Sequence, residues 1–272
     1  MTNLQLFLQE KAQEDLLLWS DQLEAMERFS LSCAVVDESC LEIGILPARY
    51  QRNSQMISVA QQLLLLRSKV AVIGCGGLGG YVIEELARLG VGRIIAIDPD
   101  VFEEHNLNRQ MLSSMSALGQ TKVKAAAERV QQINPAVSLQ PLQVSFSASN
   151  GRGLLKDADV VVDAVDNIPT RLELAELCSE IGKPLVHGAI AGWYGHVTTI
   201  FPGESTLQKI YHQWQSGAGV ESDLGNPSFT PALVASFQVA EVCKFLLGKG
   251  RLLRNRMLSI NLLEMEVEEI PL

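Results

Sequence analysis

Apolar and polar residues alternate along this chain in a pattern typical of a parallel β-sheet covered by helices. Short apolar runs predict five strands, at residues 69–74, 93–97, 138–142, 159–164 and 184–189. Amphipathic segments between them predict helices at about 79–89, 121–133 and 170–181. Such alternation favours parallel strands joined by crossover helices on both faces of the sheet. We therefore predict an α/β fold, Rossmann-like and doubly wound, with a mostly parallel sheet.

The pattern changes after Gly188. Residues 196–201 predict an antiparallel strand, residues 202–230 a long loop rich in Gly, Ser and Pro, and residues 231–247 a helix. Two further strands are predicted at 257–263 and about 265–270. We therefore expect the mostly parallel sheet to end in an antiparallel C-terminal part.

The first 48 residues differ in character from the rest. Helices are predicted at 4–18 and about 21–29, and the segment holds nine acidic and two basic residues, so −7 of the total net charge of −9. A helix-turn-helix is an alternative, but an acidic chain is a poor candidate for nucleic-acid binding. We predict an acidic helical N-terminal extension at 1–48, which covers the site or packs a dimer, and a larger domain at 49–272.

Composition narrows the class of protein further. Hydrophobic residues make up 47% of the chain, enough for a sizeable core, and no window of 18 uncharged apolar residues predicts a membrane span. The start of the sequence lacks the basic region of a secretory signal. The five cysteines are odd in number and never spaced CxxC, which argues against a disulfide framework and a four-cysteine zinc site. We expect a cytoplasmic protein.

Residues 69–110 carry the most informative motif. An apolar strand runs into a glycine-rich turn, an amphipathic helix follows, and a second strand ends at Asp98. Glycines permit a tight turn and close backbone approach, and the following helix N-terminus presents free N–H groups to phosphate. This order is typical of a nucleotide-binding βαβ unit. Its glycines are Gly74, Gly76, Gly77 and Gly79.

Polar and charged residues at predicted strand ends, in a loop and at a helix start favour ATP as the nucleotide. Asp98 lies 24 residues after Gly74, where a carboxylate would accept hydrogen bonds from ribose. Asp166 follows the apolar run at 159–164, and Lys122 lies at a helix start. Asn108 and Arg109 belong to the polar loop after Asp98. Cations for polyphosphate and a carboxylate for Mg²⁺ suit ATP, and an NAD-dependent oxidoreductase leaves them unexplained.

Several motifs, in order, carry a family resemblance. They are ARYQRN (48–53), VIGCGGLGG (72–80), IDPDVFEEHNLNRQ (97–110), GQTKVKAA (119–126), INP (133–135), DAVDN (163–167) and QVAE (238–241). The chain resembles the ubiquitin-activating-enzyme-like (E1-like) superfamily, in the branch that contains the molybdopterin-synthase and thiamine-pathway sulfur-carrier adenylyltransferases. The resemblance covers about residues 48–270 and implies an ATP-binding adenylation domain at 49–272.

The resemblance implies a role for each matching residue. The four glycines would cradle the nucleotide, Asp98 would hold the ribose, and Asp166 would coordinate Mg²⁺. The remaining candidates for nucleotide contact are Asp100, Asn106, Asn108, Arg109, Gln110, Lys122 and Asn167. Arg109, Lys122 and Asp166 would be catalytic. Arg49 would join them by reaching the partner subunit's site across a homodimer.

The implied reaction is ATP- and Mg²⁺-dependent adenylation of the C-terminal Gly-Gly carboxylate of a small ubiquitin-like sulfur carrier, with release of pyrophosphate. A free α-carboxylate has a pKa near 3.5, so it needs no general base. The enzyme would align this carboxylate with the α-phosphorus and neutralise the phosphates. No nucleic acid or membrane is expected as a partner. The alternatives are a related enzyme acting on a small molecule or on modified tRNA, of the threonylcarbamoyl-adenosine dehydratase type, and a non-catalytic nucleotide-binding regulator.

The sequence differs in two features from the sulfur-carrier adenylyltransferases that it resembles. Those relatives usually carry two CxxC pairs for structural zinc, whereas the corresponding stretch here, 205–211, has no cysteine, so we predict no zinc. The loop at 202–230 also lacks a cysteine that could form a thioester or persulfide. We expect Cys75 to be a packed residue and the histidines His187, His196 and His212 to be structural. Trp193 and Tyr194 either line a groove for the carrier tail or pack in a dimer core.

Overall fold

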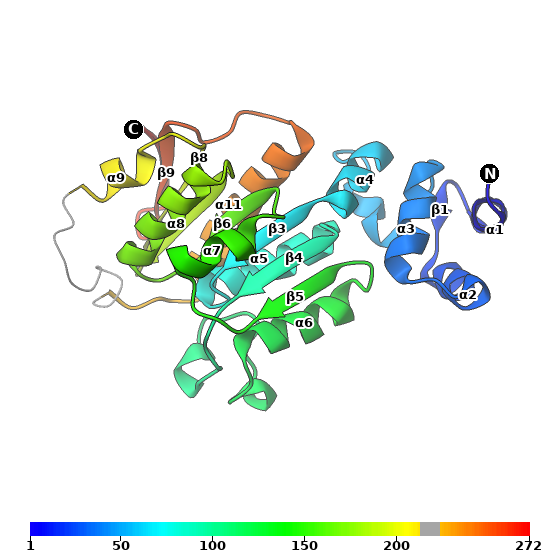
Figure 1. The fold of residues 1–272 in the computed structure, drawn as a ribbon, viewed down its shortest axis with the longest axis horizontal. Coiled ribbons are helices and arrows are strands. Elements are labelled where there is room, and N and C mark those ends of the chain that lie inside the picture. Colours follow the sequence, from blue (N-terminus) through cyan, green and yellow to red (C-terminus); the bar gives the residue numbers. More distant parts are fainter. Residues whose placement is uncertain (213–223) are drawn as a thin grey trace.

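The computed structural model describes residues 1–212 and 224–272. Its centre is an eight-stranded sheet in the order β10-β9-β8-β7-β6-β3-β4-β5 (Figure 1). The strands are β3 (Lys69–Ile73), β4 (Arg93–Ile97), β5 (Ser138–Leu142), β6 (Val160–Asp163), β7 (Leu185–Ala191), β8 (Tyr194–Ile200), β9 (Arg256–Asn261) and β10 (Glu266–Pro271).

The sheet is parallel from β5 to β7 and antiparallel from β7 to β10. This confirms the predicted doubly wound sheet with an antiparallel C-terminal part. The chain passes from β3 to β4 and β5 on one side and then crosses to β6 on the other. Such a reversal opens a crevice beyond the carboxyl ends of the two strands where it occurs, here β3 and β6.

Helices cover both faces of the sheet because successive residues of a buried strand point to opposite sides. Val70 and Val72 of β3 pack in one core with α5 (Gly77–Leu89), α6 (Lys122–Ile133) and α11 (Phe229–Leu247). Ala71 and Ile73 pack in the other core, with α7 (Ala148–Leu155) and α8 (Ile168–Glu180).

Helix α11 is apolar and long enough, by length and composition, to cross a membrane. It is a core helix here, because it packs against α5, β7 and β8. Val234, Ala235 and Val242 on its inner face are fully buried. The helix begins two residues before the predicted start at Pro231.

The N-terminal extension contains more elements than the sequence pattern predicts. The first helix, α1 (Asn3–Lys11), ends early because Leu16–Leu17 form β1, which pairs in parallel with β2 (Leu46–Pro47). Helices α2 (Trp19–Phe29) and α3 (Cys33–Glu42) follow. The prediction of one helix over 4–18 was therefore wrong, and α3 was not predicted.

The extension packs onto the larger domain through α4 (Val59–Arg67) and the 3₁₀ turn at Ala48–Asn53. Tyr50 of this turn is buried, and its hydroxyl accepts a hydrogen bond from Asn134 Nδ2 at 2.8 Å. Asn134 Nδ2 also donates to Ala87 O at the end of α5. Neither α4 nor α7 was predicted, because both are short and follow irregular segments.

The predicted loop at 202–230 contains a short helix, α9 (Thr206–Ile210), in its described part. Residues 213–223 of that prediction lie outside the described residues. Two helix glycines differ in how closely the surrounding backbone approaches them. A Cβ on Gly79 of α5 would lie 1.8 Å from Gly74 O, whereas a Cβ on Gly153 of α7 would meet nothing within 4 Å.

We expect Gly79→Ala to lower the free energy of unfolding by about 3 kcal/mol or more, because the methyl group overlaps the backbone of the glycine turn. Gly153→Ala is the matched control, and we expect it to raise stability by about 0.5–1 kcal/mol because it removes a glycine from an open helix position. Urea unfolding monitored by circular dichroism measures both. Equal stabilities of the two variants would contradict the packing described here.

Candidate functional site

A cavity of about 440 Å³ opens beyond the carboxyl ends of β3, β4 and β6. Its volume falls in the range of small-molecule and cofactor sites. The cavity brings together ten of the predicted site residues, from five separate segments. They are Gly74, Gly76, Gly77, Asp98, Asp100, Arg109, Gln110, Lys122, Asp166 and Asn167.

The glycine turn forms the floor of the cavity. Gly74 has a φ of +93°, and a Cβ there would lie 2.5 Å from Ala164 O. Only glycine satisfies both conditions without strain. Gly76 is the N-cap of α5 and has no side chain to accept the first backbone N–H groups of the helix. These groups therefore face the cavity as donors for an anion such as phosphate.

Asp98 fixes the glycine turn to the end of β4. Its Oδ2 accepts a hydrogen bond from Cys75 N at 2.7 Å, and its Oδ1 accepts one from Asp100 N at 2.8 Å. Burial raises the pKa of this carboxyl above its usual value, partly offset by these backbone donors. The predicted contact with ribose stays a prediction, and the structure adds a role in shaping the turn.

Lys122 and Asp100 form an ion pair at the side of the cavity. Lys122 Nζ lies 2.9 Å from Asp100 Oδ2, and the backbone N–H of Lys122 donates to Asp100 O. The lysine is buried, whereas the carboxylate of Asp100 is largely exposed. A buried lysine with one exposed partner can exchange that partner for a polyphosphate without changing its own position.

The polar loop after β4 presents Arg109 and Gln110 to the cavity. Asn106 organises this loop, because its carbonyl accepts hydrogen bonds from both Arg109 N and Gln110 N. Arg109 Nη1 donates to His105 O and to Asn108 Oδ1. Gln110 is 7% exposed, and its Oε1 has no hydrogen-bond partner among the described residues. Buried amide oxygens are normally paired, so Gln110 offers an acceptor to a ligand.

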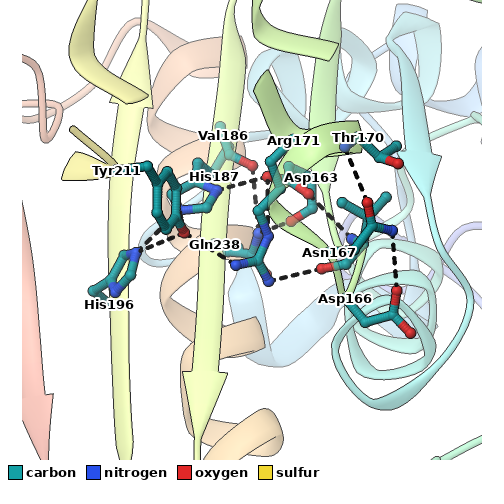
Figure 2. A network of polar contacts seen from close by, with 11 residues as sticks. Asp163, Asp166, Asn167, Thr170, Arg171, Val186, His187, His196, Tyr211 and Gln238 are labelled. Atoms are coloured by element: carbon teal, nitrogen blue, oxygen red, sulfur yellow. Dashed lines mark hydrogen bonds and ion pairs between the residues drawn. The ribbon is translucent and has the colours of Figure 1, made fainter. Parts of the chain in front are cut away.

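Asp166 and Asn167 lie on the turn between β6 and α8. Asn167 is the N-cap of α8, since its Oδ1 accepts a hydrogen bond from Thr170 N at 3.0 Å. Asp166 is exposed to the cavity, and its Oδ1 accepts one bond, from Asn167 Nδ2 (Figure 2). Its carboxylate is thus available to a cation, and the capping role falls to its neighbour.

Four predicted residues do not line the cavity. Gly79 packs α5 against the glycine turn, Asn106 is buried within the polar loop, and Asn108 Nδ2 donates to Asn226 O at the cavity rim. Arg49 lies on the 3₁₀ turn at Ala48–Asn53, against the N-terminal extension. Its guanidinium forms an ion pair with Asp37, donates to Gln22 and stacks on Trp19. Within its own chain Arg49 is therefore occupied by structural partners.

A buried polar network that the sequence pattern did not predict lies next to Asp166 (Figure 2). Arg171 of α8 is 1% exposed, and its Nη2 donates to Val165 O at 2.8 Å. Its Nη1 donates to the hydroxyl of Tyr211 at 3.0 Å. Asp163 Oδ2 lies 2.6 Å from His187 Nδ1. The run of charged and polar residues on α8 gave no signal that one arginine points inward.

The two histidines of this network, His187 and His196, face each other. Their Nε2 atoms lie 3.0 Å apart, so one must carry the proton that the other accepts. When His187 is charged, its Nδ1 donates to Asp163 and its Nε2 donates to His196. Burial lowers the pKa of His196 well below its usual value, and the charges of His187 and Arg171 add to this effect.

Cysteine chemistry does not contribute to the site. Cys75 lies in the glycine turn, and burial raises the pKa of its thiol well above the usual value. A buried thiol of this kind is a poor nucleophile at neutral pH. Among the described residues no three His, Cys, Asp or Glu side chains form a group that could hold a metal ion. The expected absence of zinc stays a prediction.

The residues present fit ATP with Mg²⁺. The cavity combines free backbone donors at Gly76, an unpaired buried acceptor at Gln110, two cations at Arg109 and Lys122, and an exposed carboxylate at Asp166. A hard divalent cation held by one carboxylate and by phosphate oxygens requires no larger cluster of ligands.

Comparison with known proteins assigns the family. The model of the ThiF family matches residues 50–272. The chain is 37% identical over 227 residues to the SAMP-activating enzyme E1 of Haloferax volcanii, which covers 82% of this chain and 84% of that protein. It is 34% identical over 226 residues to the sulfur carrier protein adenylyltransferase of Thermus thermophilus, covering 79% and 83%. The chain belongs to the ThiF family, which confirms the resemblance in its sequence, and its class is that of an adenylyltransferase.

Other matches agree with this class. The chain is 33% identical over 231 residues to the adenylyltransferase and sulfurtransferase MOCS3 of Arabidopsis thaliana, which covers 82% of this chain and 50% of that protein, so it spans about half its length. Among solved structures, Escherichia coli MccB with ATP has a TM-score of 0.67 at 21% identity, covering 92% of this chain and 82% of MccB. This likeness shows the shared fold.

The pair of His187 and His196 predicts an acid-dependent loss of stability. The pKa of His196 is lowered in the folded state, so the unfolded state binds its proton more tightly. The contribution of the neutral His196 to the free energy of unfolding is complete above the unfolded-state pKa of about 6.5. It is lost as the pH falls below that value. We expect wild-type stability to fall more steeply than that of His196→Gln, with a difference of slope up to about 1.4 kcal/mol per pH unit.

Urea unfolding at several pH values between 7.5 and 5 measures this difference. His212→Gln is the matched control, because His212 is exposed. We expect its pH dependence to equal that of the wild type. The assignment of a neutral His196 is wrong if His196→Gln and wild type show parallel curves.

Proposed function

We propose that this enzyme adenylates the C-terminal Gly-Gly carboxylate of a small ubiquitin-like sulfur-carrier protein, with ATP as the co-substrate, Mg²⁺ as the cofactor and pyrophosphate as the second product. The observation that carries the proposal is the cavity in which the glycine turn, Arg109, Lys122 and Asp166 meet. The names of the relatives above 30% identity support it, since they include a SAMP-activating enzyme and a sulfur carrier protein adenylyltransferase.

Each group of the cavity has a part in this reaction. The first N–H groups of α5 would bind the phosphates, and Lys122 and Arg109 would neutralise charge on the departing pyrophosphate. Mg²⁺ supplies further positive charge to the phosphates when it is bound, and Asp166 would hold it. The carrier carboxylate is already ionised at neutral pH, so the chain needs to supply alignment and not a base.

The carrier tail would enter near Ile190 and Asn226, which line the cavity on the side of β7. Trp193 lies on the turn after β7 and Tyr194 begins β8, and both are exposed. Trp193 stacks on Phe229, with ring centroids 4.6 Å apart. The exposed side chains of Trp193 and Tyr194 are consistent with either of their predicted roles. They would line a groove for the carrier tail or form a surface for a second copy.

A related reaction on a small molecule or on modified tRNA is the alternative. Several solved structures of similar fold are of MccB, one of them described as a microcin C7 biosynthetic enzyme in complex with N-formylated MccA. Their identity to this chain is below 25%, so they support the fold and leave the substrate open. The acidic net charge of −9 makes tRNA the weaker of these substrates.

We expect ATP–pyrophosphate exchange that requires Mg²⁺ and one particular Gly-Gly-ending carrier. Asp166→Ala should lower this exchange at least about a hundredfold, because it removes a charge that acts on the reacting phosphates. Asp157→Ala is the matched control, since Asp157 is exposed and lies outside the cavity. Exchange in the absence of any carrier, or equal rates for both variants, would contradict the proposal.

We further propose that the enzyme works as a homodimer in which the segment 48–53 completes the site of the second copy. Arg49 was the expected residue, but it is held within its own chain by Asp37. Arg52 of the same 3₁₀ turn is exposed and is therefore better placed to reach a second copy.

Mixing two inactive variants tests this arrangement. Arg52→Ala and Asp166→Ala should each be inactive alone, and random re-association should restore about a quarter of wild-type exchange, because half of the dimers then hold one intact site of two. Arg49→Ala mixed with Asp166→Ala distinguishes the two arginines. No recovery with either arginine variant would show that the segment acts within its own chain.

A further inference from the structure

The backbone of Val165 is held on both sides by buried side chains, one residue before Asp166. Val165 O accepts a hydrogen bond from Arg171 Nη2 at 2.8 Å, and Val165 N donates to Asp163 Oδ1 at 3.1 Å. Both side chains are fully buried. Together they fix both peptide groups of Val165, and with them the direction in which the chain enters the turn that carries Asp166.

The guanidinium of Arg171 is itself held in a defined orientation. Its Nη1 donates to the hydroxyl of Tyr211, and its Nε lies 4.0 Å from Asp163 Oδ2. The ring of Tyr211 packs edge-on against His187, at a centroid distance of 5.9 Å, and His187 is bonded to the same Asp163 carboxylate. Figure 2 shows these side chains gathered on one side of the turn, with Asp166 on the other.

A third side chain holds the strand end from the opposite face of the sheet. Gln238 of α11 is buried, and its Nε2 donates to Asp163 O at 2.8 Å and to Val186 O at 3.3 Å. The end of β6 and the residues after it thus accept hydrogen bonds from Arg171 of α8 on one face and from Gln238 of α11 on the other. The turn that follows has few ways to move, while Asp166 remains exposed to the cavity.

We propose that Arg171 is a positioning residue for Asp166. Tyr211 and Asp163 hold the guanidinium of Arg171 in the orientation in which it donates to Val165 O. Arg171 acts through the carbonyl of Val165 and does not itself need to contact the metal. The inference rests on the proposed function, because it assigns Asp166 to the cation that accompanies ATP. Partners that orient a ligand in this way commonly change metal affinity by about 10- to 100-fold when they are altered.

The alternative is that this network only stabilises the fold. A purely structural arginine would lower stability on substitution and leave the metal affinity of the remaining folded protein unchanged. A positioning arginine also changes metal affinity, while binding of the nucleotide without metal stays the same. The two roles are therefore separable by measurements at equilibrium that do not depend on turnover.

Arg171→Lys keeps the positive charge and removes the planar fork that bonds Val165 and Tyr211 at the same time. Electron paramagnetic resonance of Mn²⁺, titrated in the presence of a non-hydrolysable ATP analogue, measures the affinity of the metal site. We expect Arg171→Lys to weaken Mn²⁺ binding by about tenfold or more. The affinity for the analogue without metal, measured by calorimetry, should be unchanged.

Tyr211→Phe is the second variant, because it removes one hydroxyl and leaves the ring in place. We expect a smaller loss of Mn²⁺ affinity, about threefold, since the bond from Arg171 to Val165 is retained. Arg152→Lys on α7 is the matched control, because Arg152 is exposed and lies outside the cavity. It should bind Mn²⁺ as tightly as the wild type.

Hydrogen exchange of the peptide that contains Ala164–Asn167 provides a readout that needs no ligand. Loss of the bond from Arg171 to Val165 should free the turn, so we expect faster exchange in Arg171→Lys. Tyr211→Phe keeps this bond and only loosens the guanidinium, so we expect a smaller increase there, and Arg152→Lys should exchange like the wild type. Unchanged exchange in this peptide, or unchanged Mn²⁺ affinity in a folded Arg171→Lys protein, would overturn the inference.

The proposed function can fail separately. A wild-type protein that binds Mn²⁺ with the analogue through Asp166, but supports no exchange with any carrier, would refute the carrier as substrate and leave the role of Arg171 intact. Equal Mn²⁺ affinities of the wild type and Asp166→Ala would refute both the role of Asp166 in the proposed function and the role of Arg171.

Discussion

The close approach of the glycine turn to the ends of β3 and β6 is the constraint on which the site depends. Gly74 adopts a positive φ directly against the carbonyl of Ala164, and Gly79 lets the first turn of α5 lie on the backbone of Gly74. A side chain at either position would push the helix away from the sheet. The N-terminus of α5 then could not face the crevice, and the turn that carries Asp166 would lose its support on the opposite side.

Charge in the crevice follows from the same geometry. The end of β4 lies beside the glycine turn, so Asp98 can bond Cys75 N and Asp100 N at once. Asp100 in turn accepts hydrogen bonds from the side chain and from the backbone N–H of Lys122, which begins α6. A buried lysine is thus held at the edge of a cavity whose floor consists of backbone donors. An anionic ligand would meet positive potential from several elements that are rigid before it binds.

Much of the fold and the nucleotide site could be predicted from the sequence, because both rest on local signals. Apolar strands of four to seven residues and glycines at fixed spacing are visible without a structure, and they place Gly74, Asp98 and Asp166 at strand ends. Long-range partners are not visible in this way. Arg49 matched a motif, yet its guanidinium pairs with Asp37, and nothing in the sequence of α8 singles out Arg171 as the arginine that points inward. The pairing of β1 with β2, which ends α1 early, is also a tertiary effect.

The central claim is that the carboxylate of a carrier protein becomes an acyl adenylate in this cavity. Intact-mass spectrometry of each candidate carrier after incubation with the enzyme, ATP and Mg²⁺, with pyrophosphatase to remove the product, tests it most directly. We expect one Gly-Gly-ending carrier to gain the mass of one adenylyl group, and a carrier lacking its final glycine to remain unmodified. Unmodified carriers in a reaction that instead adenylates a small molecule or a tRNA would contradict it.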